Sequence, residues 1–443
     1  MTAVHTEIRS WGNVCGGDHN VVPLFWRDQE VPFPAPVLPF GTGRSYGDSC
    51  LNTGGTLLAT GGLDRFLSFD PASGVLRTEA GATLEAILRF SIPHGFFVPV
   101  SLGTKLITVG GAIANDVHGK NHHGAGTFGC HVRSLDLLRS DGRSLTCSPT
   151  ENVDLFRATI GGLGLTGLIL SAEIVLVRIP SAFLDAEAIR FRNFEEYLAL
   201  AAESDQKFEH TSAWADLLNG GKAFGRGIFL RGNFSESGAR SRFSTRRTPL
   251  TMPFRAPNWL LNRASVGLFN RFYFWRQFRT AKRMRVHYDP FFFPLDVLHR
   301  WNQLYGKRGF FQYQFLLPFR SMVAGMEEVL FLLRRSSIRP FLTVFKQFGS
   351  LPSPGILSFP MEGITVALDF PNRGRITRET FDRIDKIVAS HDGRLYPAKD
   401  ARMPGAYFRK FFPAWREFRN HIDPAFGSDL WRRVTGGADE GGR

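Results

Sequence analysis

Histidine, lysine and glycine are concentrated in the segment 109–131, VGGAIANDVHGKNHHGAGTFGCH. Glycine is needed where the backbone adopts a positive φ or lies against a ligand with no Cβ in the way. Six glycines alternate here with polar side chains that could meet the phosphates and reacting atoms of a ligand, and Gly103 precedes them. The segment therefore predicts a cradle for a cofactor. Its titratable side chains include His118, Lys120, His122, His123 and His131.

The histidines of this segment have two simpler interpretations. His118, His122 and His123 could bind a metal ion, but no acidic or cysteine partner accompanies them at a suggestive spacing. They could also be hydrogen-bonded histidines of a polar loop, which is what we expect of His122 and His123. No metal site is predicted.

Two further glycine clusters point to a nucleotide. The loop 39–48 (PFGTGRSYGD) has backbone N–H groups that could form a concave site for a pyrophosphate. A surface turn is the alternative, and the loop alone does not separate the two. The cluster 162–167 (GLGLTG) has GxGxxG spacing, but the dinucleotide fingerprint requires a helix to follow. Because 168–177 (LILSAEIVLV) is typical of a strand, we expect some other nucleotide cofactor than a nicotinamide.

Composition is that of a globular protein with two or three domains in 443 residues. The first residues contain no apolar signal region, and the apolar run 160–177 is broken by glycines, Ser171 and Glu173. The four cysteines form no CxxC pair, so neither a disulfide framework nor a zinc site is expected. The chain fits a reducing, cytoplasmic compartment.

The net charge of +14 is concentrated between residues 240 and 285, where 12 arginines and lysines occur without any Asp or Glu. Nucleic acid would suit this charge, but no nucleic-acid-binding motif accompanies it, so we do not expect the protein to bind nucleic acid. A solvated disordered loop would lack large apolar side chains. Aromatics such as Trp259, Phe269, Phe272 and Trp275 instead interleave with the arginines. This mixture predicts a segment that docks on an anionic membrane surface.

Short strands and few helices predict an α+β fold. Strands are expected at 66–69 and 75–78, and a helix capped by Thr83 at 84–88. Asp141-Gly142 indicates a type I′ turn between strands 135–139 and 144–147. We expect Thr380 to open a helix that buries Phe381, Ile384, Ile387 and Val388 and ends before Gly393.

Several of these stretches together resemble the vanillyl-alcohol-oxidase-type flavin enzymes. The resemblance rests on GTGRSYGD at 41–48, GGAIANDVHGKNHH at 110–123 and GGLGLTGLIL at 161–170. The chain is most similar to the branch that acts on polyprenyl-phosphate ribose. The matching stretches for that branch are 212–214 (SAW), 309–315 (GFFQYQF), Lys346, 369–371 (DFP) and 393–400 (GRLYPAKD). HGKNHH and YPAKD are its most specific motifs.

The resemblance implies a fold and a function. A two-subdomain, PCMH-type FAD-binding domain would span 1–180 and be completed by 394–443, around an antiparallel-sheet substrate domain at 181–393 with its basic aromatic loop at 240–285. The implied reaction oxidises the 2′-hydroxyl of a polyprenyl-phosphate pentose to a 2-keto sugar, the first half of an epimerisation in cell-envelope arabinose synthesis. A short-chain reductase would complete the epimerisation. The protein would be cytoplasmic and peripherally bound to the inner membrane.

The resemblance also implies residue roles. Flavin N5 accepts a hydride in such oxidations, and the protein must take the hydroxyl proton. Lys399, with His118 and Tyr46, is expected to do this. The predicted FAD-binding residues are Gly41, Thr42, Gly43, Arg44, Ser45, Tyr46, Gly47, Asp48, Gly103, Thr104, Thr108, Gly110, Gly111, Asn115, Val117, His118, Ile169 and Tyr396. The predicted substrate-binding residues are Lys120, Trp214, Gln312, Gln314, Lys346, Thr365 and Ala367.

Three positions depart from the family. Arg44 stands where covalent members carry a histidine, so FAD is expected to be non-covalent. Ala367 replaces a cysteine that captures inhibitors covalently, so thiol-directed inhibitors should fail. Thr365 replaces an asparagine, which leaves the sugar and its stereochemistry open.

Other interpretations stay open. Without the resemblance, Lys399 and Asp400 would be an exposed pair at a strand end, and Trp214 and the strand 312–315 would be core. A soluble sugar, polyol or aldonolactone is the alternative substrate. A protein of another class would use its arginine-rich segment to bind nucleic acid or membrane without catalysis.

Overall fold

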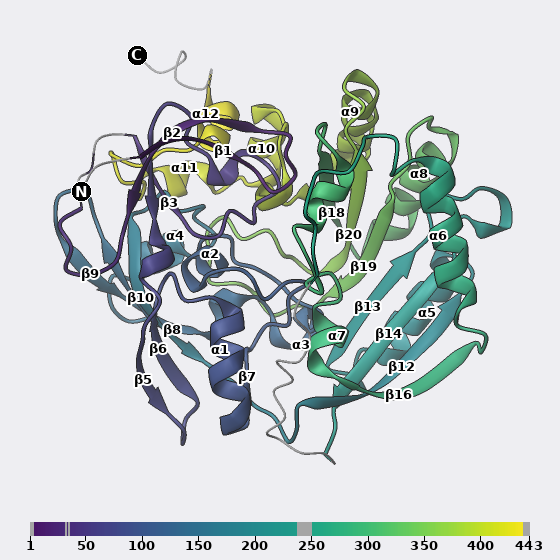
Figure 1. Cartoon of the computed structure of the whole chain (residues 1–443), viewed down its shortest axis with the longest axis horizontal. Coiled ribbons are helices and arrows are strands. Elements are labelled where there is room, and N and C mark those ends of the chain that lie inside the picture. The colour runs from purple at the N-terminus through teal and green to yellow at the C-terminus, as the bar shows by residue number, and fades with distance from the viewer. Residues whose placement is uncertain (1–3, 32, 34–35, 237–249, 437–443) are drawn as a thin grey trace.

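A computed structural model describes residues 4–31, 33, 36–236 and 250–436 as two sheet-rich halves that face each other (Figure 1). Arg240, Arg242, Arg246 and Arg247 of the predicted basic segment lie outside the described residues. Mixed helices and antiparallel sheets confirm the predicted α+β class.

The first half contains a four-stranded and a five-stranded sheet. The four-stranded sheet has the order β1 (Val4–Arg9), β2 (Gly16–Pro23), β4 (Thr56–Ala59), β3 (Val37–Phe40). The five-stranded sheet has the order β5 (Phe66–Asp70), β6 (Val75–Glu79), β10 (Leu168–Val175), β8 (Val132–Leu138), β9 (Ser144–Cys147), and β7 (Phe96–Phe97) pairs with β11 (Val177–Arg178). Its helices are α1 (Leu84–Ser91), α2 (Val109–Ala114), α3 (His122–Ala125) and α4 (Val153–Thr159).

The second half is an eight-stranded antiparallel sheet. Its order is β16 (Ala281–His287), β12 (Phe183–Phe191), β14 (Gly227–Phe234), β13 (His210–Ala215), β19 (Leu342–Phe348), β20 (Gly363–Pro371), β18 (Phe310–Pro318), β21 (Arg394–Leu395). A separate parallel pair joins β15 (Leu250–Thr251) to β17 (Leu298–His299). The helices of this half are α5 (Phe194–Ser204), α6 (Arg263–Trp275), α7 (Tyr288–Phe292), α8 (Met322–Arg335) and α9 (Arg375–Ser390).

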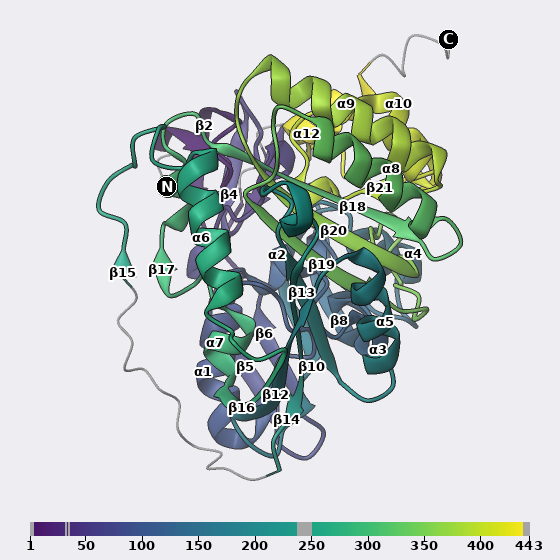
Figure 2. The same cartoon turned by 90° about the vertical axis from the view of Figure 1, so that its right-hand side faces the viewer.

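Strand alternation gives the large sheet two different faces. Phe345, Val366 and Phe315 form one cross-strand row and are buried in the same core as apolar residues of α5, α8 and α9. The residues that alternate with these three along each strand point to the other face of the sheet, which α6 covers in part. Figure 2 shows α5 and α6 on opposite sides of the sheet. One face therefore makes core, and the other is available to line a site.

The end of the chain returns to the first half. The helices α10 (Gly405–Phe411), α11 (Trp415–Arg419) and α12 (Asp429–Thr435) lie beside β1 and β2 (Figure 1). Asp429 accepts hydrogen bonds from the backbone N and Oγ1 of Thr53 at 2.9 and 2.6 Å. Residues some 380 positions apart in the chain are thereby joined.

Two local predictions are wrong. Positive φ in the β8–β9 turn is confined to Gly142, whereas a type I′ turn requires it at two successive residues. The physical reason is a longer loop, in which Arg139 N donates to Arg143 O. The second error concerns α9, which begins at Arg375 rather than at Thr380. Thr380 Oγ1 donates to Ile376 O, so this hydroxyl bonds back within the helix instead of capping it.

Among the described residues, no helix is long and apolar enough to cross a membrane.

Candidate functional site

A cavity of about 320 Å³ lies between the two halves and gathers most of the predicted site. Its walls include Lys399 of the predicted catalytic residues and Gln312, Gln314, Lys346 and Ala367 of the predicted substrate residues. They also include the predicted cofactor residues Gly41, Thr42, Gly43, Arg44, Ser45, Tyr46, Gly103, Thr104, Thr108, Gly110, Gly111, Asn115, Val117, His118, Ile169 and Tyr396. Gly47, Asp48, Lys120, Trp214 and Thr365 lie outside these walls.

One wall is made mainly of backbone. Thr108 caps α2 by accepting a hydrogen bond from Gly111 N at 3.2 Å. A Cβ at Gly41 would lie 2.5 Å from Thr108 Oγ1, so the 41–46 loop reaches the start of this helix only because residue 41 is glycine. Gly43 has a φ of +61°, which lets the loop turn. Two short glycine segments are thus packed against each other at the cavity.

The opposite wall is made of side chains on three neighbouring strands. The register pairs Gln312 with Asp369, Gln314 with Ala367, and Thr365 with Lys346. Because paired residues share a face, these side chains all point to the cavity side of the sheet. Residues from 312 to 369 are brought together in this way by strand pairing alone.

Lys399 enters the cavity from the short helical turn at Pro397–Lys399. Its Nζ lies 3.8 Å from the centroid of the Tyr46 ring, and Tyr46 N donates to Ala398 O at 3.1 Å. Burial lowers the pKa of Lys399 to about 7, while Asp369 opposes that shift and Lys346 adds to it. A substantial fraction of the side chain is therefore a neutral amine at neutral pH, able to accept a proton.

His118 is held as a neutral imidazole. Burial, with Lys346 next in importance, lowers its pKa well below the usual value. Gln314 Nε2 donates to His118 Nε2 at 2.8 Å and to Thr365 Oγ1 at 3.1 Å. Thr365 in turn donates to Phe315 O. This hydrogen-bonded row fixes the ring at the junction of the two halves.

Two partly buried lysines give the site a positive character. Burial lowers the pKa of Lys346 to about 8 and that of Lys120 to about 7. Lys120 Nζ donates to the carbonyl oxygens of Phe291 and Phe292. Within the described part of the chain, no carboxylate lies within ion-pair distance of either lysine. An anionic group would meet uncompensated charge here.

Comparisons with known proteins agree with this geometry. The family model described as "FAD binding domain" matches residues 33–148. Decaprenylphosphoryl-β-D-ribose oxidase of Mycolicibacterium smegmatis is 35% identical over 413 residues, which are 90% of this chain and 89% of that protein. The chain belongs to this oxidase family. It is an FAD-dependent oxidoreductase, and the resemblance drawn from the sequence is confirmed.

Two further relatives extend the comparison. An uncharacterized protein in the mprA 5′ region of Streptomyces coelicolor is 32% identical over 80% of this chain and 99% of its own length. Mitochondrial D-2-hydroxyglutarate dehydrogenase of Bos taurus is 30% identical, but only over 35% of this chain and 31% of its own. The similarity to the oxidase family therefore covers both halves, whereas that to the dehydrogenase covers about a third of this chain.

The backbone-lined wall fits FAD. Arg44 Nε and His118 Nδ1 are buried without a hydrogen-bond partner in the described part of the protein, so each can still bind a polar ligand atom. The Arg44 guanidinium stacks on Trp11 at 4.0 Å. Gly110, Gly111, Gly164 and Gly167 place backbone without side chains at the same cavity. The glycine cradle is where an extended, anionic cofactor of this family can be accommodated.

Three residues near the site received no predicted role from the sequence, although Asp369 belongs to the matching stretch 369–371. Asp369 is buried, accepts a hydrogen bond from Gln312 Nε2 at 2.7 Å and has its pKa raised to about 7 by burial. Asp296 accepts from Thr104 Oγ1 and Lys105 N, and Trp11 supports Arg44. The period-two spacing of 365, 367 and 369 could have found Asp369. Trp11 and Asp296 carry no local signal.

Trp214 lies one strand beyond the cavity. It pairs with Val344, which lines the cavity, and so shares the face of Lys346. Its ring packs edge-on against Tyr273 of α6, with centroids 4.9 Å apart. The histidines 122, 123 and 118 gather no metal ligands, since no group of three or more His, Cys, Asp or Glu in the described residues could hold an ion.

Proposed function

We propose that this protein oxidises the 2′-hydroxyl of a polyprenyl-phosphate pentose to the 2-keto sugar, as the first half of an epimerisation that supplies arabinose to the cell envelope. The observation that carries the proposal is Lys399, a partly buried lysine with a pKa of about 7 in a cavity between the FAD-binding segment and a lysine-bearing sheet. The 35% identity to decaprenylphosphoryl-β-D-ribose oxidase over both chains supports the substrate class. A short-chain reductase acting on the keto sugar would complete the epimerisation.

The domain arrangement follows from the same assignment. Residues 1–180 and 394–443 would form a PCMH-type, two-subdomain FAD-binding domain, and 181–393 the substrate domain. The two smaller sheets, the large antiparallel sheet and the return of α12 to Thr53 support this division. FAD is held without a covalent bond, because an arginine at position 44 cannot form the histidyl link. Flavin released into the supernatant on acid precipitation would test this.

Each residue of the site has a proposed task. FAD, when bound, accepts the hydride from the sugar carbon. Neutral Lys399 takes the proton from the hydroxyl, and Tyr46 orients the amine through its ring contact. His118 and Gln314 are linked by a hydrogen bond, and we assign this pair to positioning the sugar against the flavin. Asp369 compensates the charge on Lys399 when the amine is protonated.

The phosphate end of the substrate lies toward Lys346. This lysine lines the cavity, is partly buried and has a lowered pKa, so a phosphate would stabilise its charged form. Lys120 lies behind the cavity wall and adds to the same positive potential. Lysine suits a phosphate as a compact point charge. A substrate without the phosphate would leave these charges uncompensated.

The lipid end lies toward α6. Phe274 of this helix is buried against the sheet, whereas Leu268, Phe269 and Phe272 are 70%, 60% and 68% exposed. A row of neighbouring residues leads from the cavity to this exposed face. Val344 is the strand partner of Trp214, the Trp214 ring packs against Tyr273, and Tyr273 stacks on Phe269 with ring centroids 6.0 Å apart. We assign this track to the polyprenyl tail and the exposed face of α6 to an anionic membrane, which places the protein at the cytoplasmic side of the inner membrane.

An anaerobic flavin-bleaching assay tests the function. The purified yellow protein is mixed with polyprenyl-phosphate ribose, with free ribose or with simple polyols, and absorbance is followed. Bleaching by the lipid-linked sugar alone, abolished in Lys399→Ala, is the expected result. Bleaching by soluble polyols would instead assign the protein to the oxidases of soluble sugars, polyols or aldonolactones. Protein that purifies colourless and refuses added FAD would overturn the cofactor assignment.

A further inference from the structure

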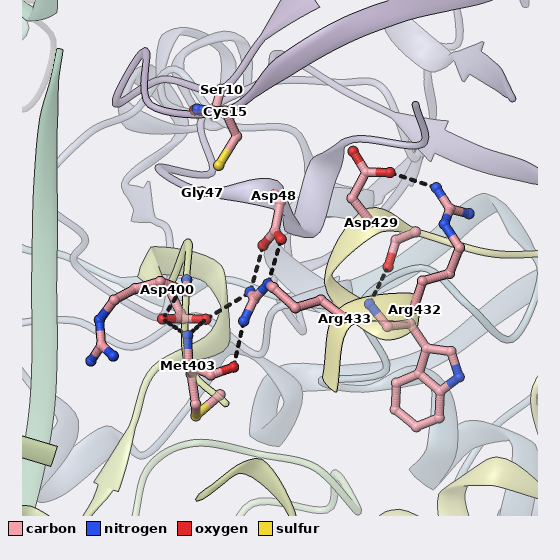
Figure 3. A network of polar contacts seen from close by, with 12 residues as sticks. Ser10, Cys15, Gly47, Asp48, Asp400, Met403, Asp429, Arg432 and Arg433 are labelled. Atoms are coloured by element: carbon pink, nitrogen blue, oxygen red, sulfur yellow. Dashed lines mark hydrogen bonds and ion pairs between the residues drawn. The ribbon is translucent and has the colours of Figure 1, made fainter. Parts of the chain in front are cut away.

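Arg433, near the end of the chain, lies between two buried carboxylates (Figure 3). Its Nε donates to Asp48 Oδ2 at 2.7 Å, and its Nη2 donates to Asp48 Oδ1 and to Asp400 Oδ2, both at 2.8 Å. Its Nη1 donates to Met403 O at 2.6 Å. The Asp48 and Asp400 side chains are only 9% and 6% exposed. We call Arg433, Asp48 and Asp400 the arginine clamp.

The clamp joins the two segments that carry Tyr46 and Lys399. Asp48 follows Tyr46 by two residues, and Asp400 directly follows Lys399. The segments are in backbone contact as well, because a Cβ at Gly47 would lie 1.6 Å from Asp400 O. Gly47 and Asp48, predicted to bind the cofactor, thus lie behind the cavity wall and fasten Tyr46 to Lys399.

Charge explains why an arginine is required at this point. Two buried carboxylates repel each other unless a cation compensates them. Burial raises the pKa of Asp48, and the contact with Arg433 opposes that shift. The planar guanidinium satisfies both acids at once, which a lysine ammonium cannot do with the same geometry.

The helix that carries Arg433 is itself anchored. Ser428 caps α12 by accepting from Trp431 N, and Asp429 N donates to Leu51 O. The neighbouring Arg432 points elsewhere, toward Asp429 (Figure 3), and it also donates to Asn52 Oδ1. Arg432 therefore offers a matched control, since it is an arginine of the same helix that makes no bond to Asp48 or Asp400 in the described structure.

We propose that Arg433 is a positioning residue that holds Lys399 and Tyr46 in register at the site of proton transfer. The proposal rests on the function proposed above, because it assumes that Lys399 lies beside the bound flavin. Without the clamp, the 396–402 segment loses its tie to α12 and its side-chain link to Asp48, and the backbone hydrogen bond from Tyr46 N to Ala398 O is left to hold it to the Tyr46 loop. Lys399 then moves toward solvent and away from its fixed distance to the Tyr46 ring.

The first test is a pH titration of the flavin absorption spectrum of the holoenzyme. A charge beside the flavin shifts its bands, so protonation of Lys399 is expected to appear as a transition near pH 7 that is missing in Lys399→Met. Asp369, Lys346 and Tyr46 also face Lys399, and the Met variant separates its contribution from theirs. In Arg433→Gln the transition moves to higher pH, because Lys399 becomes better solvated. In Arg432→Gln it stays where it is.

The second test is the rate of anaerobic flavin reduction. Arg433→Gln is expected to lower the rate constant by about 10- to 100-fold, the effect of a misplaced reacting group, with a smaller change in substrate affinity. Arg433→Lys keeps the charge but not the forked guanidinium, so its rate constant should lie between those of the parent protein and Arg433→Gln. Added guanidinium ion should restore part of the rate in Arg433→Gln. Arg432→Gln should change the rate by less than about twofold.

The outcomes separate the clamp from the proposed function. An unmoved transition in Arg433→Gln, or an equal shift in Arg432→Gln, would overturn the positioning role even if the lipid-linked sugar is oxidised. A parent protein without any transition that depends on Lys399 would overturn it too. If the transition moves as expected while the lipid-linked sugar fails to bleach the flavin, the clamp stands and the assigned substrate is wrong.

Discussion

The cavity has one wall of backbone, from the 41–46 loop and α2, and one wall of side chains, from β18, β19 and β20. The backbone wall is suited to recognition by shape, since its glycines leave room for the cofactor that we propose to lie there. The sheet wall recognises by charge and hydrogen bonds, through Lys346, Gln312 and Gln314. A change to the first wall should therefore act on cofactor binding as a whole. A change to the second should act on one reaction parameter at a time.

The largest effect is expected for Gly111→Phe. A Cβ at Gly111 has one neighbour within 4 Å in the described structure, Thr108 Oγ1 at 3.1 Å, and Gly111 lines the cavity, so we expect a phenyl ring there to fill the cavity while the fold is kept. The variant should purify folded and without flavin, as measured by absorbance and by circular dichroism. Gly124→Phe is the control, because Gly124 is exposed and a Cβ there meets nothing within 4 Å. A yellow Gly111→Phe protein with one flavin per chain would contradict the assignment of cofactor binding to the backbone wall.

The next effect concerns Lys399 and pH. Its pKa of about 7 lies below the usual lysine value because of burial, so the amine is charged below pH 7 and neutral above it. Only the neutral amine accepts a proton, and the rate of flavin reduction should rise as the pH increases through about 7. Lys399→Met should lower that rate by about 10²- to 10⁴-fold and abolish the rise. Stopped-flow measurements across the pH range check this, with the exposed Lys410→Met as control.

A smaller effect is expected for Lys346→Met. Loss of one charged contact to the substrate phosphate should raise the dissociation constant by about 10- to 100-fold, with FAD still bound. The same variant should bind a substrate analogue without the phosphate as the parent protein does. Titrations of the two ligands against both proteins make the comparison. An equal loss for both would remove Lys346 from the phosphate end.

The smallest effect is expected on the exposed face of α6. Replacing both Phe269 and Phe272 by serine should weaken binding to anionic liposomes by about tenfold, because each exposed ring contributes apolar area at the interface. Vesicle cosedimentation at two salt concentrations measures this. Ile376→Ser, a change at a residue that is 47% exposed on α9, should leave binding unaltered. Equal binding by all three proteins would contradict the docking assignment.

The backbone wall could be predicted from the sequence and the sheet wall only in part. Glycine spacing, the Thr83 cap and the strand after the 162–167 cluster are local properties, and each is where the pattern indicated. The predictions of a type I′ turn at Asp141-Gly142 and of a helix start at Thr380 were wrong. In both cases loop length and neighbouring hydrogen bonds override the conformational preference of a single residue. Gln312, Gln314 and Lys346 were found through the family resemblance rather than through any pattern of their own.

The sequence by itself determined the glycine cradle and the concentration of positive charge, because these depend on residue types within short segments, and the flavin followed from the family resemblance. Only the tertiary structure decided between an exposed Lys399–Asp400 pair and a lysine that lines the cavity. In the folded protein Lys399 points into the cavity and Asp400 points toward Arg433. The local sequence does not show that these two adjacent side chains point in different directions. The tertiary structure also decided the pKa of Lys399, since burial is set by segments far apart in the chain. Desolvation and long-range pairing are properties of the packed molecule, which no stretch of sequence contains alone.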